Sequence, residues 1–404
     1  MTSHRIVFLN RFYWPDEPAT AQLLVDLAEA LARHGEQPVI VTSSPVRRRT
    51  PRFEERHGVA IHRVFSPRFG GAGLLARILA FTTFYPLAFL RLLRVVRRGD
   101  TLVAMTDPPL SGVLAGFVAR LRGARLVHWV QDIYPEIAVT VTGHRWLLAS
   151  RPARDAAWRQ AIACVVPGET MARTVLDAGV TPARVIVSPN WAPAGLRPPL
   201  DADVAALRSA WGLEGKFVAA YSGNLGRVHD LPPLLEIAEH LRDDPSFILL
   251  FIGGGAGRIE LEQRANQLGL RNVRFLRAQP RDRLAASLGV GDVHFVTLKP
   301  GAEHCVFPSK LYGIAQVGRP VVFIGAPDAD VAKLVATHAF GQSFTREETP
   351  RVAAWLRHLR STPALQADLA AAALRFAPDG RETALAQWRE LLGSAVPSAT
   401  ASTP

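Results

Sequence analysis

The sequence predicts an α/β protein built as two successive doubly wound halves, in which parallel strands alternate with helices. Three observations predict this fold. Short apolar runs rich in β-branched residues recur along the chain, stretches with helical spacing separate them, and a proline-rich break at 189–199 divides the 404 residues near the middle. Continuous apolar strands that alternate with helices are typical of a parallel sheet buried on both faces.

The first half begins with a strand at Arg5–Leu9, followed by a helix whose leucines recur at helical spacing from Leu23 to Leu31. Gly35 can end that helix. The remaining apolar runs predict strands at Val39–Thr42, Val59–Val64, Leu102–Met105, Leu126–Val130 and Val185–Val187, with helices near 74–98, 109–121, 151–162 and 169–178.

The second half repeats this alternation after the proline-rich break. Strands are predicted at Phe217–Tyr221, Phe247–Ile252, Val273–Leu276, Val293–Thr297 and Val321–Ile324, with helices near 231–242, 257–268, 309–317 and 328–337. We therefore expect a first domain at 1–192, a second domain at 200–378, a last helix within 379–395, and a tail at 396–404 whose composition is typical of disorder.

The composition excludes several classes of protein. Apolar residues make up 48% of the chain and charged residues 20%, as in soluble globular proteins. The two cysteines, Cys164 and Cys305, lie far apart, which argues against a disulfide framework or a structural zinc site. The sequence enters its first strand without a signal-peptide pattern, so we expect a cytoplasmic protein.

The net charge of +12 predicts a polyanionic partner, for which nucleic acid, anionic lipid and a nucleotide substrate are the candidates. One segment favours lipid. Residues 78–90 carry no charge and are too short to span a bilayer, and they lie between Arg77 and a run of arginines at Arg91, Arg94, Arg97 and Arg98. The segment 78–98 can lie on an anionic membrane surface, or it can be a core helix with a basic end exposed to solvent.

The most informative stretch for chemistry is Tyr221–Asp230, which joins a predicted strand to a predicted helix. Gly223 and Asn224 allow backbone N–H groups to approach a phosphate, and Arg227 can add a forked donor. A simple tight turn is the alternative. Gly253, in the glycine run after the next strand, is a second candidate for contact with a nucleotide.

A second cationic stretch surrounds Lys310, one of only four lysines in this arginine-rich chain. Pro308 and Ser309 are expected to start a helix there, and Lys310 in its first turn opposes the helix dipole unless an anion lies beside it. Lys299 ends the preceding strand and is expected at the same edge of the sheet. Lys299, Lys310 and Arg227 together predict a diphosphate site.

Polar residues of the first half also follow strands. Thr20 can cap the first helix or allow close approach of a ligand, and Asp132 and Glu136 are expected to face the cleft between the halves. Carboxylates there can orient an acceptor hydroxyl or accept a proton, although both can equally be helix caps. The acidic pairs Asp201/Asp203 and Asp328/Asp330 are interpreted as helix caps, and no metal-ligand spacing or hydrolase motif occurs.

From Ile6 to Leu392 the chain resembles the retaining glycosyltransferase family 4, in the branch that acts in bacterial cell-surface polysaccharide synthesis of the colanic acid or O-antigen type. The resemblance rests on four stretches, which are Asp107–Leu110, Val130–Glu136, Tyr221–Arg227 and the region from Leu298 through Pro308–Gly313.

The resemblance implies a GT-B fold, in which two Rossmann-like domains face a central cleft and the last helix packs on the first domain. It implies transfer of a sugar, hexosyl or N-acetylhexosaminyl, from a nucleotide-diphosphate sugar to a lipid-linked saccharide with retention of configuration. A UDP-sugar is favoured as donor, with no metal or other cofactor, and the protein would lie on the inner face of the cytoplasmic membrane.

By the same resemblance, Gly223 and Asn224 would line the donor loop, and Arg227, Lys299 and Lys310 would hold the diphosphate. Together with the residues singled out above, we expect Asp132, Arg227 and Lys310 to act in catalysis. The donor is expected to contact Thr20, Gly223, Asn224, Arg227, Gly253, Lys299, Pro308, Ser309, Lys310 and Tyr312.

The chain departs from the family pattern at three positions. The places of two glutamates that usually lie eight residues apart are taken by Cys305 and Gly313, and a usual lysine is replaced by His229. Contacts to the ribose and the sugar must therefore come from other residues. A nucleotide-sugar epimerase, an inactive GT-B scaffold and a basic nucleic-acid-binding protein remain alternatives, although the arginines are spread through both halves rather than gathered in one stripe.

Overall fold

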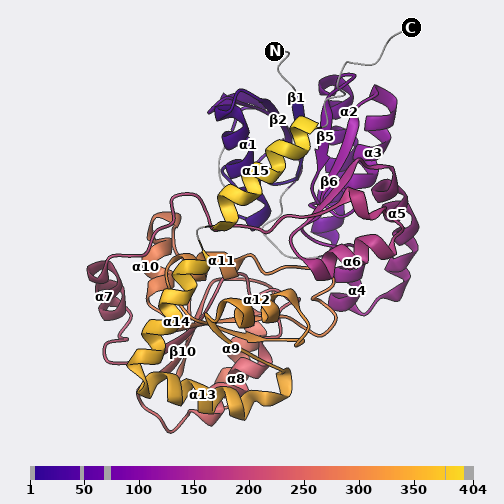
Figure 1. Ribbon diagram of the computed structural model, residues 1–404. Coiled ribbons are helices and arrows are strands. Elements are labelled where there is room, and N and C mark those ends of the chain that lie inside the picture. Colours follow the sequence, from indigo (N-terminus) through magenta and orange to yellow (C-terminus); the bar gives the residue numbers. More distant parts are fainter. Residues whose placement is uncertain (1–4, 46–49, 68–73, 378, 395–404) are drawn as a thin grey trace. The chain divides into compact units, whose positions relative to one another are not determined.

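The computed structural model describes residues 5–45, 50–67, 74–377 and 379–394, so the predicted tail at 396–404 lies outside the described residues (Figure 1). The chain forms two compact units. Unit 1 comprises Met1–Pro135, Leu148–Asn190 and Gly380–Pro404, and unit 2 comprises Glu136–Leu147 and Trp191–Asp379. Residues 136–147 thus belong to unit 2, although the sequence boundary includes them in the first domain.

Unit 1 is built on an eight-stranded sheet with the order β3-β4-β2-β1-β5-β6-β7-β8. Neighbouring strands are parallel except for the β3–β4 pair at one edge. The strands are β1 (Arg5–Leu9), β2 (Gln37–Ser43), β3 (Phe53–Arg56), β4 (Val59–Val64), β5 (Thr101–Ala104), β6 (Arg125–Trp129), β7 (Ala163–Val166) and β8 (Val185–Val187).

Helices of unit 1 connect these strands and bury their apolar faces. They are α1 (Ala19–Arg33), α2 (Leu74–Val95), α3 (Ser111–Arg122), α5 (Arg151–Gln160) and α6 (Glu169–Asp177), with 3₁₀ turns at Arg145–Ser150 and Pro182–Arg184. The last helix, α15 (Asp379–Ser394), also belongs to this unit: the Trp388 ring lies 4.8 Å from the Trp129 ring, and both are almost fully buried.

Unit 2 is built on a six-stranded sheet with the order β11-β10-β9-β12-β13-β14, in which every neighbouring pair is parallel. The strands are β9 (Phe217–Ser222), β10 (Phe247–Ile252), β11 (Val273–Leu276), β12 (Val293–Thr297), β13 (Val321–Ile324) and β14 (Gly341–Phe344). Alternate residues of β9 pack into opposite layers: Ala219 and Tyr221 join one hydrophobic cluster, and Val218 and Ala220 join the other.

Nine α-helices belong to unit 2 among the described residues. They are α4 (Glu136–Thr142), α7 (Asp201–Ala210), α8 (Pro232–His240), α9 (Arg258–Gln267), α10 (Leu284–Gly289), α11 (Lys310–Gln316), α12 (Asp330–His338), α13 (Thr349–Ser361) and α14 (Pro363–Phe376), with 3₁₀ turns at Arg281–Arg283 and Arg346–Glu348.

The predicted α/β fold with two doubly wound sheets is confirmed, and the predicted strands occur within one or two residues of their expected bounds. The sequence did not predict β3, β7 or β14. Charged residues dominate β3 and polar residues dominate β14, because each is an edge strand that needs no continuous apolar run.

Predictions of helix caps were wrong. α1 begins at Ala19 with Pro18 at its N-cap position, so Thr20 lies inside the helix. α7 and α12 likewise have Leu200 and Ala329 at their N-caps and no side-chain capping bond. The acidic residues of these two helices lie in the first turn, where negative charge complements the helix dipole; they are Asp201, Asp203 and Asp330.

Candidate active site

The strand order of unit 2 reverses at β9, which lies between β10 and β12. Open α/β sheets bind ligands at the carboxyl ends of the strands beside such a switch point. The loop that begins at Gly223 follows β9, and the turn that begins at Leu298 follows β12. The two stretches with the predicted diphosphate ligands therefore leave the sheet at this point.

Glycines allow the loops after β9 and β10 to pack against each other. A Cβ on Gly253 would lie 2.0 Å from the Gly223 carbonyl oxygen, and one on Gly255 would lie 2.5 Å from Asn224 Oδ1. The Leu225 N–H donates to the Gly254 carbonyl at 2.7 Å. Close approach of two backbones thus accounts for Gly253 without a ligand, and it holds the Gly223 turn in place.

Lys310 lies beneath this turn. A Cβ on Gly223 would lie 3.5 Å from Lys310 Nζ, and Nζ itself lies 3.7 Å from the centre of the Tyr221 ring. The Tyr221 hydroxyl in turn donates to the Asn224 carbonyl at 3.0 Å. Gly223, Asn224 and Lys310 are therefore brought together, as predicted from the sequence.

The ammonium nitrogen of Lys310 is buried and has no hydrogen-bond partner within the described part of the chain. Burial lowers the pKa of Lys310 to about 7. The seven-residue helix α11 begins at this residue. Removal from water, more than the dipole of so short a helix, therefore makes the charged form costly. A bound anion would supply the missing partner.

The neighbouring polar groups are already paired. His229 Nδ1 lies 2.8 Å from the Thr297 carbonyl oxygen, and burial followed by the charge of Lys310 lowers the pKa of His229 to about 3. The Lys299 N–H donates to the Val228 carbonyl at 3.1 Å, which ties the turn after β12 to the glycine loop. The Arg227 side chain is exposed, and the structure shows no contact between it and Lys310.

The remaining residues predicted to bind the donor lie around the start of α11. Ser309 is the N-cap residue, and the Pro308 carbonyl accepts the Leu311 N–H at 3.2 Å. The Tyr312 ring stacks between Phe307 and Phe376, each with its ring centre at 5.8 Å. Packing of α11 against α14 accounts for Tyr312 without a ligand.

Two of the three positions at which the chain departs from the family pattern, Cys305 and Gly313, are buried. Cys305 Sγ lies 3.9 Å from the Gly301 carbonyl oxygen. A Cβ on Gly313 would meet the side chains of Leu196 and Leu288 at 3.8 Å, an ordinary van der Waals distance. Neither position offers an acceptor for a sugar hydroxyl.

The sequence analysis did not single out Glu303, which lies in the turn between Lys299 and Lys310. Its side chain is only 9% exposed, Oε1 lies 3.6 Å from His304 Nε2, and Oε2 is buried without a hydrogen-bond partner among the described residues. An acidic residue two positions before Cys305 was the signal that could have identified it.

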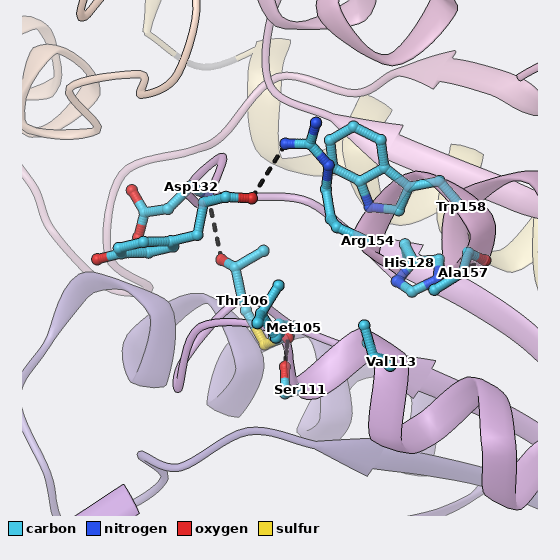
Figure 2. A pocket seen from close by; sticks show the side chains of 12 residues that line it. Met105, Thr106, Ser111, Val113, His128, Asp132, Arg154, Ala157 and Trp158 are labelled. Atoms are coloured by element: carbon cyan, nitrogen blue, oxygen red, sulfur yellow. Dashed lines mark hydrogen bonds between the residues drawn. The ribbon is translucent and has the colours of Figure 1, made fainter. Parts of the chain in front are cut away.

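Asp132 follows β6 in unit 1, and its N–H donates to Thr106 Oγ1 at 3.1 Å (Figure 2). Burial, followed by the charge of Asp107, raises the pKa of Asp132 to about 7. At neutral pH the carboxyl group therefore exists in both protonation states, which suits a group that orients a hydroxyl or exchanges a proton.

Asp132 lines a small pocket together with His128 and Arg154 (Figure 2). Arg154 donates to the Tyr134 carbonyl at 3.0 Å and stacks on Trp158 at 4.1 Å, so it is already engaged. The pocket volume of about 30 Å³ holds at most two water molecules. A sugar ring therefore does not fit inside this pocket.

Two further features of unit 1 bear on Asp132. Its neighbour Gln131 exchanges amide hydrogen bonds with Asn190 at 2.9 Å in both directions, a buried pair that the sequence did not reveal and that holds the loop. Thr20 lies partly exposed in the first turn of α1, and no described contact links it to Asp132. Glu136 begins α4 and belongs to unit 2.

The chain has two doubly wound sheets, and at the switch point of one of them a buried cation lies beneath a glycine turn. This two-domain α/β architecture is the class called GT-B. Comparisons with known proteins then show which protein families the two halves match. Residues 20–191 match the family of the glycosyl transferase 4-like domain, and residues 203–327 match the family of glycosyl transferases group 1. Both matches are to glycosyltransferase families, as the resemblance of its motifs predicted.

Two curated relatives are similar to this chain. The putative colanic acid biosynthesis glycosyl transferase WcaI of Escherichia coli is 39% identical over 170 residues, 42% of each chain. The match thus spans less than half the length of that relative. The probable glycosyltransferase WbjE of Pseudomonas aeruginosa is 25% identical over 281 residues, 68% of this chain and 70% of the relative.

Solved structures share the fold. Anabaena HepE in complex with UDP-glucose is 18% identical, with a TM-score of 0.75 over 96% of this chain and 99% of HepE. WaaG, a glycosyltransferase involved in lipopolysaccharide biosynthesis, is 15% identical, with a TM-score of 0.70 over 96% of this chain and 99% of WaaG. These matches establish the GT-B fold.

Proposed function

We propose that this protein transfers a sugar from a nucleotide-diphosphate sugar to a saccharide acceptor with retention of configuration. One observation carries the proposal. In a unit that matches a glycosyltransferase domain family, Lys310 Nζ is buried without a hydrogen-bond partner beneath a glycine turn. An unpaired buried ammonium is costly, and the diphosphate of a nucleotide sugar would pair with it.

Lys310, Arg227 and Lys299 bind the diphosphate in this proposal. As the bond between the sugar carbon and the diphosphate oxygen breaks, negative charge grows on the leaving group, and a preorganised cation stabilises that charge. The acceptor oxygen forms the new bond on the same face of the sugar. Its proton passes to the departing phosphate oxygen, so no nucleophilic carboxylate and no metal ion is needed.

Glu303 is the group that we assign to the hydroxyls of the transferred sugar. Its Oε2 is buried without a partner in the turn that joins Lys299 to the start of α11. A sugar attached to the diphosphate carries several O–H donors, and an ionised carboxylate is the strongest side-chain acceptor for them. This assignment replaces the contacts that Cys305 and Gly313 cannot make.

Asp132 orients the acceptor hydroxyl in this proposal. The names of the relative WcaI (colanic acid biosynthesis) and of the neighbour WaaG (lipopolysaccharide biosynthesis) support an acceptor that belongs to a cell-surface polysaccharide and is carried on a lipid. The UDP-glucose complex of HepE supports UDP as the nucleotide.

A peripheral location on the inner face of the cytoplasmic membrane would fit a lipid-linked acceptor. No helix within the described ranges is long and apolar enough to cross a membrane. α2 covers most of the predicted membrane segment 78–98, and the side chain of Ile78 lies outside the described residues.

A thermal-shift screen with a panel of nucleotide sugars, followed by a transfer assay, tests the proposed function. A donor at about 100 times its dissociation constant stabilises the protein by about 2.7 kcal/mol. The donor that stabilises most should then be consumed in the presence of lipid-linked acceptors, and the product should keep the anomeric configuration. Binding without transfer to any acceptor would indicate an inactive scaffold, and failure of every nucleotide to stabilise would remove the site at Lys310.

A further inference from the structure

Two neighbouring helices of unit 1 expose large apolar side chains. On α2, Leu79 and Leu90 are 51% and 46% exposed, and they lie on a stripe that recurs at helical spacing. On α3, Phe117 and Leu121 are 56% and 57% exposed and lie one turn apart. The sequence analysis assigned no role to α3.

The two stripes belong to one surface. α2 and α3 lie side by side (Figure 1). The rings of Phe89 on α2 and Phe117 on α3 lie 5.9 Å apart, and Arg122 Nε donates to the Val96 carbonyl at 2.9 Å. These contacts tie the helices together at two levels along their length. We call the exposed residues Leu79, Leu90, Phe117 and Leu121 the α2–α3 face.

One end of the α2–α3 face is strongly basic. Both helices run antiparallel to their strands, so their last turns lie at the same edge of the sheet, and the Gly99 N–H donates to the Gly123 carbonyl at 3.0 Å there. Five exposed arginines gather at this end, and none of them makes an ion pair with a described residue; they are Arg94, Arg97, Arg98, Arg120 and Arg122. The nearby Asp100 pairs with Arg5 at 3.4 Å.

We propose that the α2–α3 face binds an anionic bilayer surface, with Phe117 and Leu121 of α3 entering the boundary between headgroups and acyl chains. An apolar face beside a basic cluster is the arrangement that binds such a surface, because burial of the apolar side chains and attraction to anionic lipid act together. This inference rests on the proposed membrane location and extends it from α2 to a second helix.

Charge selects the bilayer over a second copy of this chain. In a two-fold symmetric dimer the same patch meets itself, and neither α2 nor α3 contains an acidic residue that could pair with the partner's arginines. A bilayer of anionic lipid supplies negative charge across the whole basic end. The face and its arginines therefore complement lipid and oppose self-association.

Attachment by this face also orients unit 1. With α2 and α3 flat on the bilayer, the strands of the sheet on which these helices pack run along the membrane plane. The carboxyl ends of β5 and β6, with Asp132, lie at the edge opposite the arginine cluster, about 30 Å away along α2. An acceptor carried on a lipid would then approach Asp132 from the side, without leaving the membrane surface.

Co-sedimentation of the full chain with vesicles tests this proposal. Phosphatidylglycerol vesicles should bind the wild-type protein, and phosphatidylcholine vesicles should bind it at least tenfold more weakly. The double variant Phe117→Ser/Leu121→Ser should remain folded, as a cooperative melting curve checks, and should lose at least tenfold in affinity for the anionic vesicles. A matched control is Leu200→Ser/Ile259→Ser in unit 2, whose targets are 71% and 69% exposed. This control should bind like wild type.

Three outcomes would overturn the proposal: wild-type protein that ignores anionic vesicles, vesicle binding that the α3 variant leaves intact, or a dimer in sedimentation velocity that the α3 variant dissociates. UDP affinity, measured on the same samples, separates this inference from the proposed function. Because no residue of the α2–α3 face lies in unit 2, its variants should bind UDP as wild type does. If the wild-type protein does not bind UDP at all, that result would instead contradict the proposed function.

Discussion

Lys310 has a buried ammonium group without a hydrogen-bond partner among the described residues, and it lies beneath the Gly223 turn. Its charge should therefore favour nucleotide binding but lower the stability of the empty protein. Lys310→Met keeps the length of the side chain and removes the charge. We expect the empty protein to melt at the same temperature or slightly higher, because an unpartnered buried cation is destabilising. Affinity for UDP should fall.

Turnover of this variant should fall by about 100-fold or more if the contact strengthens as the diphosphate leaves, which corresponds to about 2.7 kcal/mol. Lys333→Met is the control, since Lys333 is an exposed lysine on α12. Calorimetry and a rate assay decide the question, and normal affinity and rate in Lys310→Met would remove Lys310 from the site.

The lowered pKa of Lys310 also predicts proton uptake on nucleotide binding. At pH 8 the empty site holds mostly neutral lysine, because its pKa is about 7, whereas an adjacent diphosphate favours the charged form. Calorimetric titration with UDP in buffers of different ionisation enthalpy should show uptake approaching one proton at pH 8. The uptake should vanish in Lys310→Met, and equal uptake by both proteins would contradict the assignment.

The same pKa shift fixes the sign of the pH dependence of stability. Between pH 7 and the ordinary lysine value of 10.5, the unfolded chain holds a proton on Lys310 that the folded chain lacks. Unfolding therefore takes up a proton in this window, so the contribution of Lys310 to the free energy of unfolding rises with pH. Comparison of melting curves at pH 7 and pH 9 should show this rise in the wild type relative to Lys310→Met.

Glu303 leads to a prediction about the sugar rather than the nucleotide. Glu303→Gln keeps the shape of the side chain but weakens it as an acceptor, so affinity for the donor sugar nucleotide should fall about tenfold while affinity for UDP stays the same. Glu303 is not needed for the diphosphate contacts of Lys310. An equal loss for UDP and for the sugar nucleotide would show that Glu303 only supports the turn.

At the scale of elements, replacing two glycines of unit 2 by alanine should change the stability of the protein in opposite directions. Gly313 lies inside α11, where a Cβ would make only ordinary contacts at 3.8 Å, so Gly313→Ala should stabilise the protein by about 0.5–1 kcal/mol. Gly253 has φ +147° and a Cβ there would lie 2.0 Å from the Gly223 carbonyl, so Gly253→Ala should destabilise the protein and disturb UDP binding. Denaturant unfolding of both variants measures the two signs.

The central strands and the glycine loop could be predicted from the sequence because burial on both faces leaves a continuous apolar run, as at Phe247–Ile252. The edge strands β3 and β14, which are rich in charged or polar residues, carry no such signal. The unpaired state of Lys310 could be anticipated only in part: its place in the first turn was visible, but its burial under Tyr221 and Gly223 depends on contacts between residues 87 or more positions apart in the sequence.

At the scale of the whole molecule, the net charge of +12 overstates how strongly the protein should bind a polyanionic partner. Many arginines are structural donors to main-chain carbonyl groups. Arg208 binds the Val290 carbonyl, Arg258 binds those of Gly253 and Leu276, and Arg319 binds that of Gly289. Arginine suits this role because its planar fork offers several donors.

Since these guanidinium groups are engaged within the fold and are not free to contact phosphates, we expect only weak binding to nucleic acid. At 0.15 M salt, duplex DNA should bind with a dissociation constant above about 1 µM, in the range of non-specific electrostatic binding. Fluorescence anisotropy over a salt series measures this value. Tight binding with a steep salt dependence would favour the nucleic-acid alternative.

The packing of Trp388 against Trp129 limits how early unit 1 can finish folding while the chain is being synthesised. The ribosome makes these two residues 259 positions apart, and both rings belong to the core of unit 1. At about 5–20 residues per second, Trp129 waits roughly 13–50 s for its partner, while all of unit 2 is synthesised. The first unit to emerge is therefore the last to be completed, and during that interval a tryptophan that is buried in the finished protein lacks its aromatic partner.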